Sequence, residues 1–401
     1  MSMAEYLAEG SRRLGLGQFD EAEEAFRQGT CRFPNQPRFL ERMAFVAYLQ
    51  KDLPLARSRY ESLAAAGVSG SLSGLGTVLA EMEDYDAVFA LVSTHLEEFL
   101  AGPANPRFLS QSVNRARDLE KLRDVLLHPR VFHLLERGQI LRKLFYFGDE
   151  DLVAEFFRSH ADSYRTDFAV IGDSHAGSTF GTKVFSQRIP PVFVLPGATI
   201  AGFGKRKSTL GVFRNCHKVI AALNPSTLLF KFGQVNVDLG IYYRQFVKNM
   251  DINIGNFFIE ITKNYIQSII GLPNTTKYIV CGINMPTLVD TDTAAKYTSR
   301  VIFENKNDEN LVKELHLKLQ QNMPPYEERF QRSLLFNEIL RATCEHHGIA
   351  YFDLVDLFCQ DGKTLVPGIV RDDDHHYFLD DAWSCKVWNH VSEMTGLREL
   401  P

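Results

Sequence analysis

Hydrophobic and polar positions follow two different patterns along the chain, and the change comes near residue 160. Before it, apolar residues recur at helical spacing with little strand patterning, which predicts an all-α domain over residues 1–160. After it, five short apolar runs alternate with longer amphipathic segments. Strands that alternate with helices predict parallel βαβ units, so residues 161–401 are expected to form an α/β domain.

The five expected strands are short and apolar. They are Phe168–Ile171, Val192–Leu195, Leu228–Phe232, Tyr278–Gly282 and Ala350–Leu354. Helices are expected between them, for example over Arg244–Ile269 and Tyr326–His347. Residues 290–325 are polar, weakly patterned and long for a connection. This predicts an insertion that can cover or shape a groove in which a substrate binds.

A short turn recurs in the helical region at a nearly constant spacing. Ala56 lies 34 positions after Ala22, Val88 follows 32 positions later, and Leu122 another 34. A period near 34 with a small residue in the second helix resembles tetratricopeptide repeats. The resemblance implies paired helices that approach closely at Ala22 and Ala56. Such an array can bind a protein partner, self-associate or buttress the second domain, and an ordinary helical bundle is the alternative.

The first expected strand ends in the most informative sequence of the chain, Gly172-Asp173-Ser174. Gly172 permits a sharp turn, and the buried strand would deliver the Ser174 hydroxyl to a fixed point. A helix that begins near His175 would direct free N–H groups at negative charge forming beside Ser174. Acyl transfer through a serine nucleophile needs this geometry.

A second cluster of reactive side chains, residues 371–376, comes near the C-terminal end of the sequence. Both Asp373 with His376 and Asp372 with His375 have the spacing Asp-x-x-His. A carboxylate beside a histidine can fix its tautomer and stabilise the imidazolium that forms when the ring takes a serine proton. Aspartate and histidine also bind zinc or manganese, but a second ligand cluster at a characteristic spacing is lacking, so no metal site is predicted. A solvated acidic loop is the simplest alternative.

The Gly-Asp-Ser turn and the terminal Asp-x-x-His resemble the signature blocks of the SGNH, or GDSL-type, hydrolase superfamily, over roughly residues 165–395. The resemblance implies a three-layer, flavodoxin-like parallel sheet. It also implies Ser174 as nucleophile, His376 as general base and Asp373 as the carboxylate that orients it. Members often have an apolar residue after the catalytic histidine, and Tyr377-Phe378 follows His376, which favours His376. The pair of Asp372 with His375 is the alternative.

The same resemblance suggests which groups hold the oxyanion. A loop glycine after the second strand donates its N–H in that family, and Gly202 is the expected donor here, with Gly197 as the alternative. The family's third block is Gly-x-Asn-Asp, but Val235 stands where its asparagine belongs, and Asn236 comes one position later. Asn236 is the expected side-chain donor and Gln234 the alternative, although a structural turn amide is an equally simple explanation.

Composition excludes several function classes. A net charge of −5 over 401 residues gives no footprint for nucleic acid. No run approaches the ~18 apolar residues of a membrane span, and no secretory signal is visible, so we expect neither. The six cysteines are scattered without a C-x-x-C pair, which favours reduced thiols and a cytoplasmic location.

These observations together lead to an expected function. SGNH members act on lipids, acetylated sugars and thioesters, and some run in reverse as O-acetyltransferases. An aromatic-rich chain with helical repeats suits a large glycan, so we expect O-acetyl transfer onto a surface polysaccharide, with acetyl-CoA as acyl donor and no bound cofactor. A carbohydrate esterase is one alternative. A repeat-based adaptor with a catalytically weak α/β domain is another, because the third block is shifted.

Overall fold

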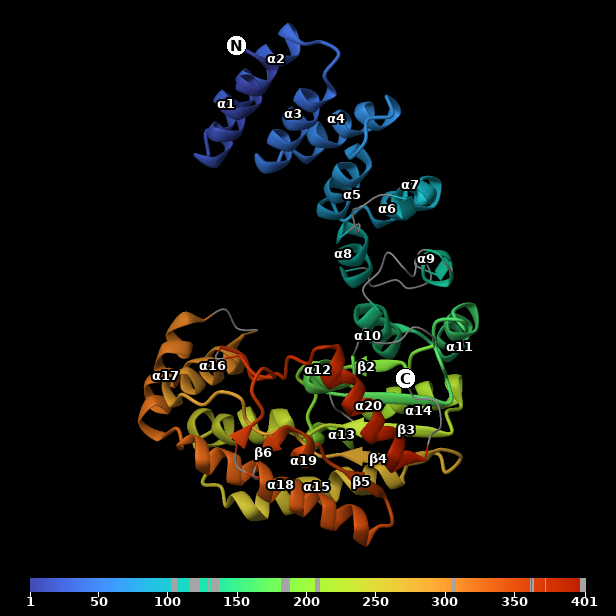
Figure 1. Ribbon diagram of the computed structural model, residues 1–401, viewed down its shortest axis with the longest axis vertical. Coiled ribbons are helices and arrows are strands. Elements are labelled where there is room, and N and C mark those ends of the chain that lie inside the picture. Colours follow the sequence, from blue (N-terminus) through green and yellow to red (C-terminus); the bar gives the residue numbers. More distant parts are fainter. Residues whose placement is uncertain are drawn as a thin grey trace. The chain divides into compact units, whose positions relative to one another are not determined.

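The computed structural model describes the chain except for residues 102–106, 116–122, 129, 131–136, 182–187, 206–209, 305–307, 361, 363, 372 and 397–401. The chain divides into two compact units, Met1–Ile140 and Leu141–Pro401. Figure 1 shows the elements of both, with helices in the described part of the first unit and a sheet in the second.

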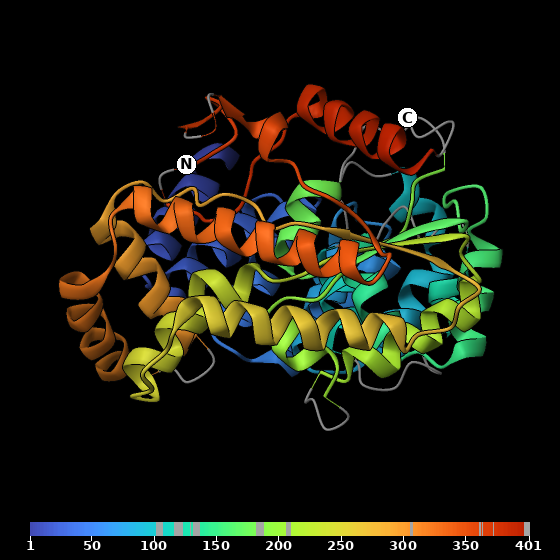
Figure 2. The ribbon, with the colours of Figure 1, turned by 90° about the horizontal axis from the view of Figure 1, so that it is seen from below.

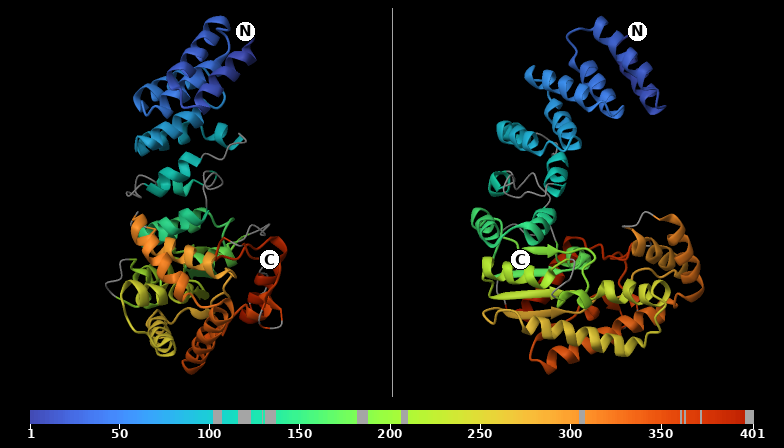
Figure 3. Two further views of the ribbon diagram at one scale, coloured as in Figure 1. Left: turned by 90° about the vertical axis from the view of Figure 1, so that its left-hand side faces the viewer. Right: turned by 180° about the vertical axis from the view of Figure 1, so that it is seen from behind.

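The first unit is helical wherever it has regular structure in the described residues. Its helices are α1 (Met3–Gly15), α2 (Phe19–Arg32), α3 (Pro37–Leu49), α4 (Leu53–Ala65), α5 (Ser71–Glu81), α6 (Tyr85–Thr94), α7 (Leu96–Ala101), α8 (Arg107–Arg115) and α9 (Arg123–Leu127), while α10 (Arg137–Phe147) crosses the division. Each helix from α1 to α5 packs against the next one in sequence (Figure 3). The predicted all-α region is therefore confirmed for this unit.

The recurring turn of the sequence marks the starts of α2, α4 and α6. Asp52 and Asp84 each cap a helix, α4 and α6, by accepting a hydrogen bond from the backbone N–H three residues later. The fourth residue of α2, α4 and α6 is Ala22, Ala56 and Val88 respectively, and all three are fully buried. The spacing near 34 therefore has a structural basis, because the same helical position faces the core in each pair.

Small residues let these helices approach closely. A Cβ at Gly10 would lie 2.2 Å from the ring of Phe26, and one at Gly74 would lie 2.3 Å from the ring of Tyr60. Each aromatic ring therefore needs a glycine on the facing helix.

The fourth predicted turn, at residues 118–122, lies outside the described residues.

The second unit contains a five-stranded parallel sheet with the order β2-β1-β3-β4-β5. Its strands are β1 (Phe168–Gly172), β2 (Val192–Val194), β3 (Thr227–Lys231), β4 (Lys277–Cys281) and β5 (Ala350–Phe352). This is the order found in flavodoxin-like doubly wound folds. All five predicted strands are present, which confirms the α/β class.

Helices precede, connect and follow the strands of this unit. They are α11 (Glu150–Ser159), α12 (Ser174–Phe180), α13 (Ile200–Phe203), α14 (Val212–Leu223), the π-helical turns η2 (Asn236–Gly240) and η3 (Tyr243–Val247), α15 (Ile254–Ile270), α16 (Thr291–Phe303), α17 (Glu309–Asn322), α18 (Tyr326–His346), α19 (Val355–Phe358) and α20 (Asp381–Thr395). A small antiparallel pair, β6 (Cys359–Gln360) and β7 (Thr364–Leu365), precedes α20. Among the helices in the described ranges, none has both the length and the apolar character needed to cross a bilayer.

Helices cover both faces of the sheet and make three layers. On one face, Trp388 of α20 contacts Phe168 of β1 and Phe180 of α12, with ring centroids 6.1 and 5.6 Å away. On the other face, Phe203 of α13 contacts Phe230 of β3 at 5.6 Å, and α14, α15 and α18 follow. Figure 2 shows α20 and α15 on opposite sides of the sheet.

The second unit begins earlier than the change of pattern at residues 160 and 161 predicts. Helix α11 packs against α14, and the Lys218 ammonium of α14 donates to the carbonyl oxygens of Leu144, Phe145 and Gly148 at 3.2, 2.6 and 2.6 Å. The end of α10 and all of α11 therefore belong with the sheet. A helical pattern cannot reveal this, because it does not show which core the helix faces.

The predicted insertion at residues 290–325 forms a hairpin of the two helices α16 and α17. Its core contains the buried side chains of Ala295, Phe303, Leu315 and Leu319. The hairpin packs on η2 and η3, the π-helical turns that follow β3. The weak pattern of the sequence conceals this regular structure, because each helix buries only a few apolar residues.

Candidate active site

A cleft with a volume of about 790 Å³ lies where the loops after β1, β2 and β3 meet. Loops after the carboxyl ends of parallel strands are the usual position of a ligand site in an open α/β sheet. Helix α16 and the segment before α20 complete its wall. Among the residues that line it are Ser174, Gly197, Tyr297, His375 and His376.

Ser174 begins α12 directly after β1, as the sequence predicts. The turn requires Gly172, because a Cβ there would lie 2.4 Å from the carbonyl oxygen of Lys231. Asp173 caps the helix by accepting the N–H of His175 at 3.0 Å. A buried strand and a capped helix thus hold the Ser174 hydroxyl at the cleft, where the residue is partly exposed.

His376 is oriented by Asp374 and not by Asp373, which corrects the prediction. The Asp374 Oδ1 accepts the backbone N–H of His376 at 2.9 Å and lies 2.7 Å from its Nδ1. Because an ionised carboxylate only accepts, Nδ1 carries the proton and Nε2 is free to take one. The Asp373 residue is exposed. Asp372, the carboxylate of the alternative pair, lies outside the described residues.

His375 is buried between the cleft and a smaller cavity of about 40 Å³. Its Nδ1 lies 3.8 Å from Asp238 Oδ2 and has no hydrogen-bond partner among the described residues. Asp238 is itself held by Gln234, whose Nε2 donates at 2.9 Å and also bonds the carbonyl oxygen of Asn284. The carboxylate that faces His375 therefore comes from the segment after β3, and the Gln234 amide is already engaged.

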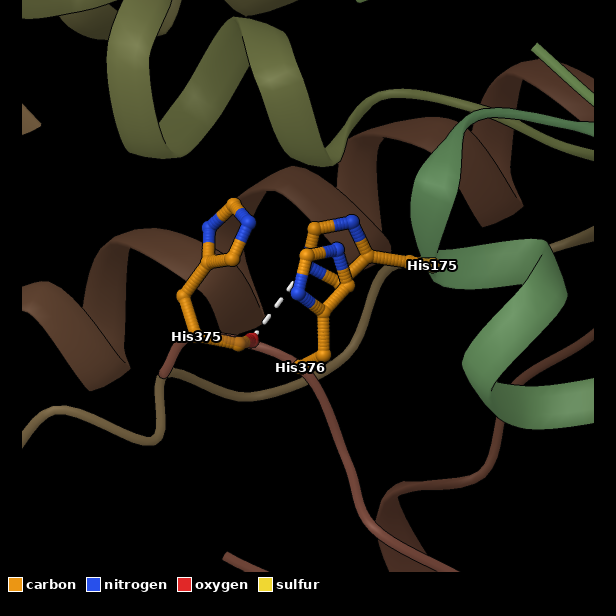
Figure 4. A group of neighbouring side chains, drawn as sticks. All are labelled: His175, His375 and His376. Atoms are coloured by element: carbon orange, nitrogen blue, oxygen red, sulfur yellow. Dashed lines mark hydrogen bonds between the residues drawn. The ribbon is translucent and has the colours of Figure 1, made fainter. Parts of the chain in front are cut away.

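Three histidine rings, those of His175, His375 and His376, gather together (Figure 4). His175, on α12, is fully buried, and its ring centroid lies 4.5 Å from that of His375 and 4.4 Å from that of His376. The rings of His175 and His376 are nearly parallel, at 26°. From the sequence, His175 is expected only to start a helix. A Ser-His pair at the end of a buried strand is the signal that could have identified it.

Burial shifts the pKa of His175, His376 and Asp173. It lowers the pKa of His175 well below its usual value, and the neighbouring His375 and His376 lower it further. Burial also lowers the pKa of His376, although Asp374 opposes the effect. Burial raises the pKa of Asp173 to about 6. A His376 ring that is neutral near neutral pH can act as a base.

The expected oxyanion donors are only partly available. The Gly202 N–H donates to the carbonyl and hydroxyl oxygens of Thr199, both at 3.1 Å, so it is engaged within its own loop. Gly197, the alternative, has a φ of +75° and lines the cleft. Asn236 is buried, and its Oδ1 accepts the N–H of Ile200 at 3.0 Å. This bond fixes the amide and leaves its Nδ2 as the donating group.

The geometry therefore brings a hydroxyl, three imidazoles and three carboxylates to one edge of the sheet.

No model of a known protein family matches the chain, and no curated protein matches it either. The side chains themselves indicate what the site can do. A neutral imidazole backed by a carboxylate can remove a proton from a hydroxyl group in the same cleft.

Proposed function

We propose that this protein is a serine-dependent acyl-transfer enzyme of the SGNH type. One observation carries the proposal: Ser174 and His376 line one cleft, and Asp374 holds the far ring nitrogen of His376. A hydroxyl, an imidazole and a carboxylate in this order are the parts of a serine nucleophile with its base. The flavodoxin-like strand order and the Gly-Asp-Ser turn after β1 support the same assignment.

The reaction proceeds in two halves. Ser174 Oγ attacks the acyl carbonyl carbon while His376 Nε2 takes the hydroxyl proton, and Asp374 stabilises the imidazolium without taking that proton. The tetrahedral intermediate expels the leaving group, which takes the proton from His376. An acceptor hydroxyl then attacks the acyl-enzyme, and His376 serves as its base in the same way.

Three donors stabilise the oxyanion in this proposal. They are the backbone N–H groups of Ser174 and Gly197 and the Nδ2 of Asn236. The Ser174 N–H belongs to the first turn of α12, where backbone N–H groups have no partner within the helix. A donor of this kind is typically worth about 3 kcal/mol of barrier.

We further propose that the acceptor is a carbohydrate and the acyl group an acetyl group from acetyl-CoA. The cleft is far larger than an acetyl group, and the aromatic side chains of Tyr243 and Tyr297 line it. Aromatic faces offer broad apolar contact while their hydroxyls stay available for hydrogen bonds, which suits a sugar ring. A surface polysaccharide is the acceptor that we favour.

In this proposal the protein works in the cytoplasm, and its helix pairs form a tetratricopeptide-like array for a protein partner or a second copy.

A carbohydrate esterase is the second candidate. Ser174 is partly exposed in the cleft, so water can reach the acyl-enzyme in place of a sugar hydroxyl. Both candidates share the same first half-reaction.

Turnover of a chromogenic acetate ester tests the shared chemistry. Ser174→Ala should lower kcat/KM by at least about 10³-fold, because the nucleophile is lost. Ser178→Ala is the matched control, since it removes a hydroxyl from the same helix outside the cleft lining and should retain most of the activity. Mass spectrometry after fluorophosphonate treatment should find the label on Ser174. An unchanged rate in Ser174→Ala excludes the mechanism.

The fate of the acetyl group separates the two candidates. With acetyl-CoA and a panel of polysaccharides, a transferase places acetate on the sugar, whereas an esterase releases acetate from acetylated glycans. A protein that turns over neither the ester nor acetyl-CoA fits the alternative of a repeat-based adaptor with a catalytically weak α/β domain.

A further inference from the structure

We propose that His175, His375 and His376 bind one divalent transition-metal ion, Zn²⁺ in the first instance, and that the bound ion blocks the serine chemistry. The metal site stands on the geometry of the three rings alone. Its inhibitory effect rests on the proposed function, because it requires His376 to be the base.

The three rings already lie close enough to share an ion. One ring nitrogen of each histidine can be chosen so that all three lie within 4.8 Å of one another. Nitrogens bound to one zinc ion at about 2.1 Å are roughly 3.4 Å apart in tetrahedral geometry. Small rotations of the side chains therefore suffice, and Figure 4 shows the rings gathered from two separate segments of the chain.

Each ring also has a carboxylate beside its Nδ1. The three pairs are His175 with Asp173 at 3.4 Å, His375 with Asp238 at 3.8 Å, and His376 with Asp374 at 2.7 Å. Metal-bound histidines usually donate their second ring N–H to a carboxylate or a carbonyl oxygen, which fixes the tautomer and leaves Nε2 for the metal. Here the His376–Asp374 pair makes this hydrogen bond, and the other two rings each have a carboxylate within 4 Å of Nδ1 that could accept one.

Two of the rings have a nitrogen that the described part of the protein leaves unbonded. The Nδ1 atoms of His175 and His375 are buried without a hydrogen-bond partner among the described residues. His175 Nε2 lies 3.3 Å from the carbonyl oxygen of His375, a long contact that coordination would replace. The proposed serine chemistry uses neither ring. Neutral imidazoles are good ligands for zinc.

The cleft supplies the remaining coordination position. His375 and His376 both line it beside Ser174, so water or the serine hydroxyl can complete a three-histidine site. When His376 Nε2 binds the ion, its lone pair can no longer accept the proton of Ser174. Metal binding and acyl transfer therefore exclude each other.

Co²⁺ is a suitable probe because its visible absorption reports nitrogen ligands directly. The full-length protein is stripped with EDTA, dialysed, and titrated with Co²⁺ and then Zn²⁺. We expect visible bands that saturate at one equivalent and vanish when Zn²⁺ displaces Co²⁺. Absence of saturable bands in the unmutated protein overturns the metal site without any need for a variant.

Variants locate the site. His175→Ala and His375→Ala should each weaken Co²⁺ binding at least about tenfold, and Asp374→Asn by about 10- to 100-fold through its histidine. His346→Ala is the matched control, since it removes an exposed histidine at the end of α18 and should bind normally. Circular dichroism checks that each variant is folded. Normal binding in all folded variants of the cluster overturns the assignment.

Inhibition is measured on the hydrolysis of the chromogenic ester by the stripped protein. Zn²⁺ should abolish the Ser174-dependent rate over the range in which it displaces Co²⁺, and EDTA should restore it. Saturable metal binding without loss of rate overturns the inhibitory role. A stripped protein that binds metal but shows no Ser174-dependent turnover contradicts the proposed function and leaves the metal site standing.

Discussion

The side chain of Asp374 bonds to a residue two positions later in its own chain, and this local contact orients the proposed base, His376. Its Oδ1 meets both the backbone N–H and the Nδ1 of His376, two positions later in the sequence. An aspartate readily forms such a turn, because its short side chain reaches the backbone two residues on. The Asp-x-x-His spacing points instead to Asp373, one position earlier, and a sequence pattern cannot resolve neighbouring carboxylates that differ only in direction.

The two carboxylates can be distinguished by removing the charge of each. Asp374→Asn should lower kcat/KM for the acetate ester by about 10²- to 10⁴-fold, because the His376 tautomer is no longer fixed. Asp373→Asn should change it little, since that residue is exposed. Both rates are measured at one pH after the folded state is verified. The opposite ranking would restore the carboxylate that the sequence favours.

The turn between β1 and α12 is the element on which the position of Ser174 depends. A Cβ at Gly172 would meet the carbonyl oxygen of Lys231 at 2.4 Å and the Cβ of Ala176 at 2.5 Å. Neither can move without shifting the sheet or the helix. The glycine was recognisable from the sequence, whereas its neighbours were not, because they come from β3 and from the far side of the turn.

Gly172→Ala should therefore lower the free energy of unfolding by about 2 kcal/mol, the cost of overpacking a buried site. Gly255→Ala is the matched control in α15, where an added Cβ has no heavy atom nearer than 3.6 Å. That change should be neutral or stabilise by up to about 1 kcal/mol through helix propensity. Urea unfolding measures both. Equal stabilities of the two variants would show that the turn tolerates a side chain.

The α16–α17 hairpin supplies one wall of the cleft through Tyr297, which contacts the His375 ring at 4.7 Å. If this wall binds the acceptor, Tyr297→Ala should raise KM for the glycan roughly tenfold and affect a small ester much less. Tyr297→Phe keeps the ring and should stay near the unmutated value. Equal losses for both substrates would mean that Tyr297 acts through His375 and not on the acceptor.

The secondary structure was largely predictable, and the division of the molecule was not. Five buried apolar runs predict the five strands of the sheet. The predicted end of helix α18 differs by one residue from its observed end at His346. The boundary was misplaced because α11 has a helical pattern like the first unit but packs on α14. The histidine cluster was incomplete for a similar reason, since His175 meets His376 only through the fold.

Two fragments test where the second unit begins. Residues 137–401 should unfold in one cooperative transition and keep the ester activity of the full chain. Residues 161–401 should be markedly less stable, because Phe193 loses its contacts with Phe145 and Phe157 at 5.8 and 6.2 Å. Thermal unfolding compares them. Equal stability of the two fragments would place the boundary at the position that the sequence suggests.

The buried polar atoms beside Ser174 have a consequence for how the protein can be improved. Asp173 Oδ2 and the Nδ1 atoms of His175 and His375 are enclosed without partners among the described residues, and each such atom typically costs about 1–3 kcal/mol. If variants are selected for thermal stability alone, we therefore expect the first substitutions to replace Asp173, His175 or His375 with apolar residues. The most heat-resistant variants would lose the proposed metal site, because two of its three histidines carry buried atoms that cost stability.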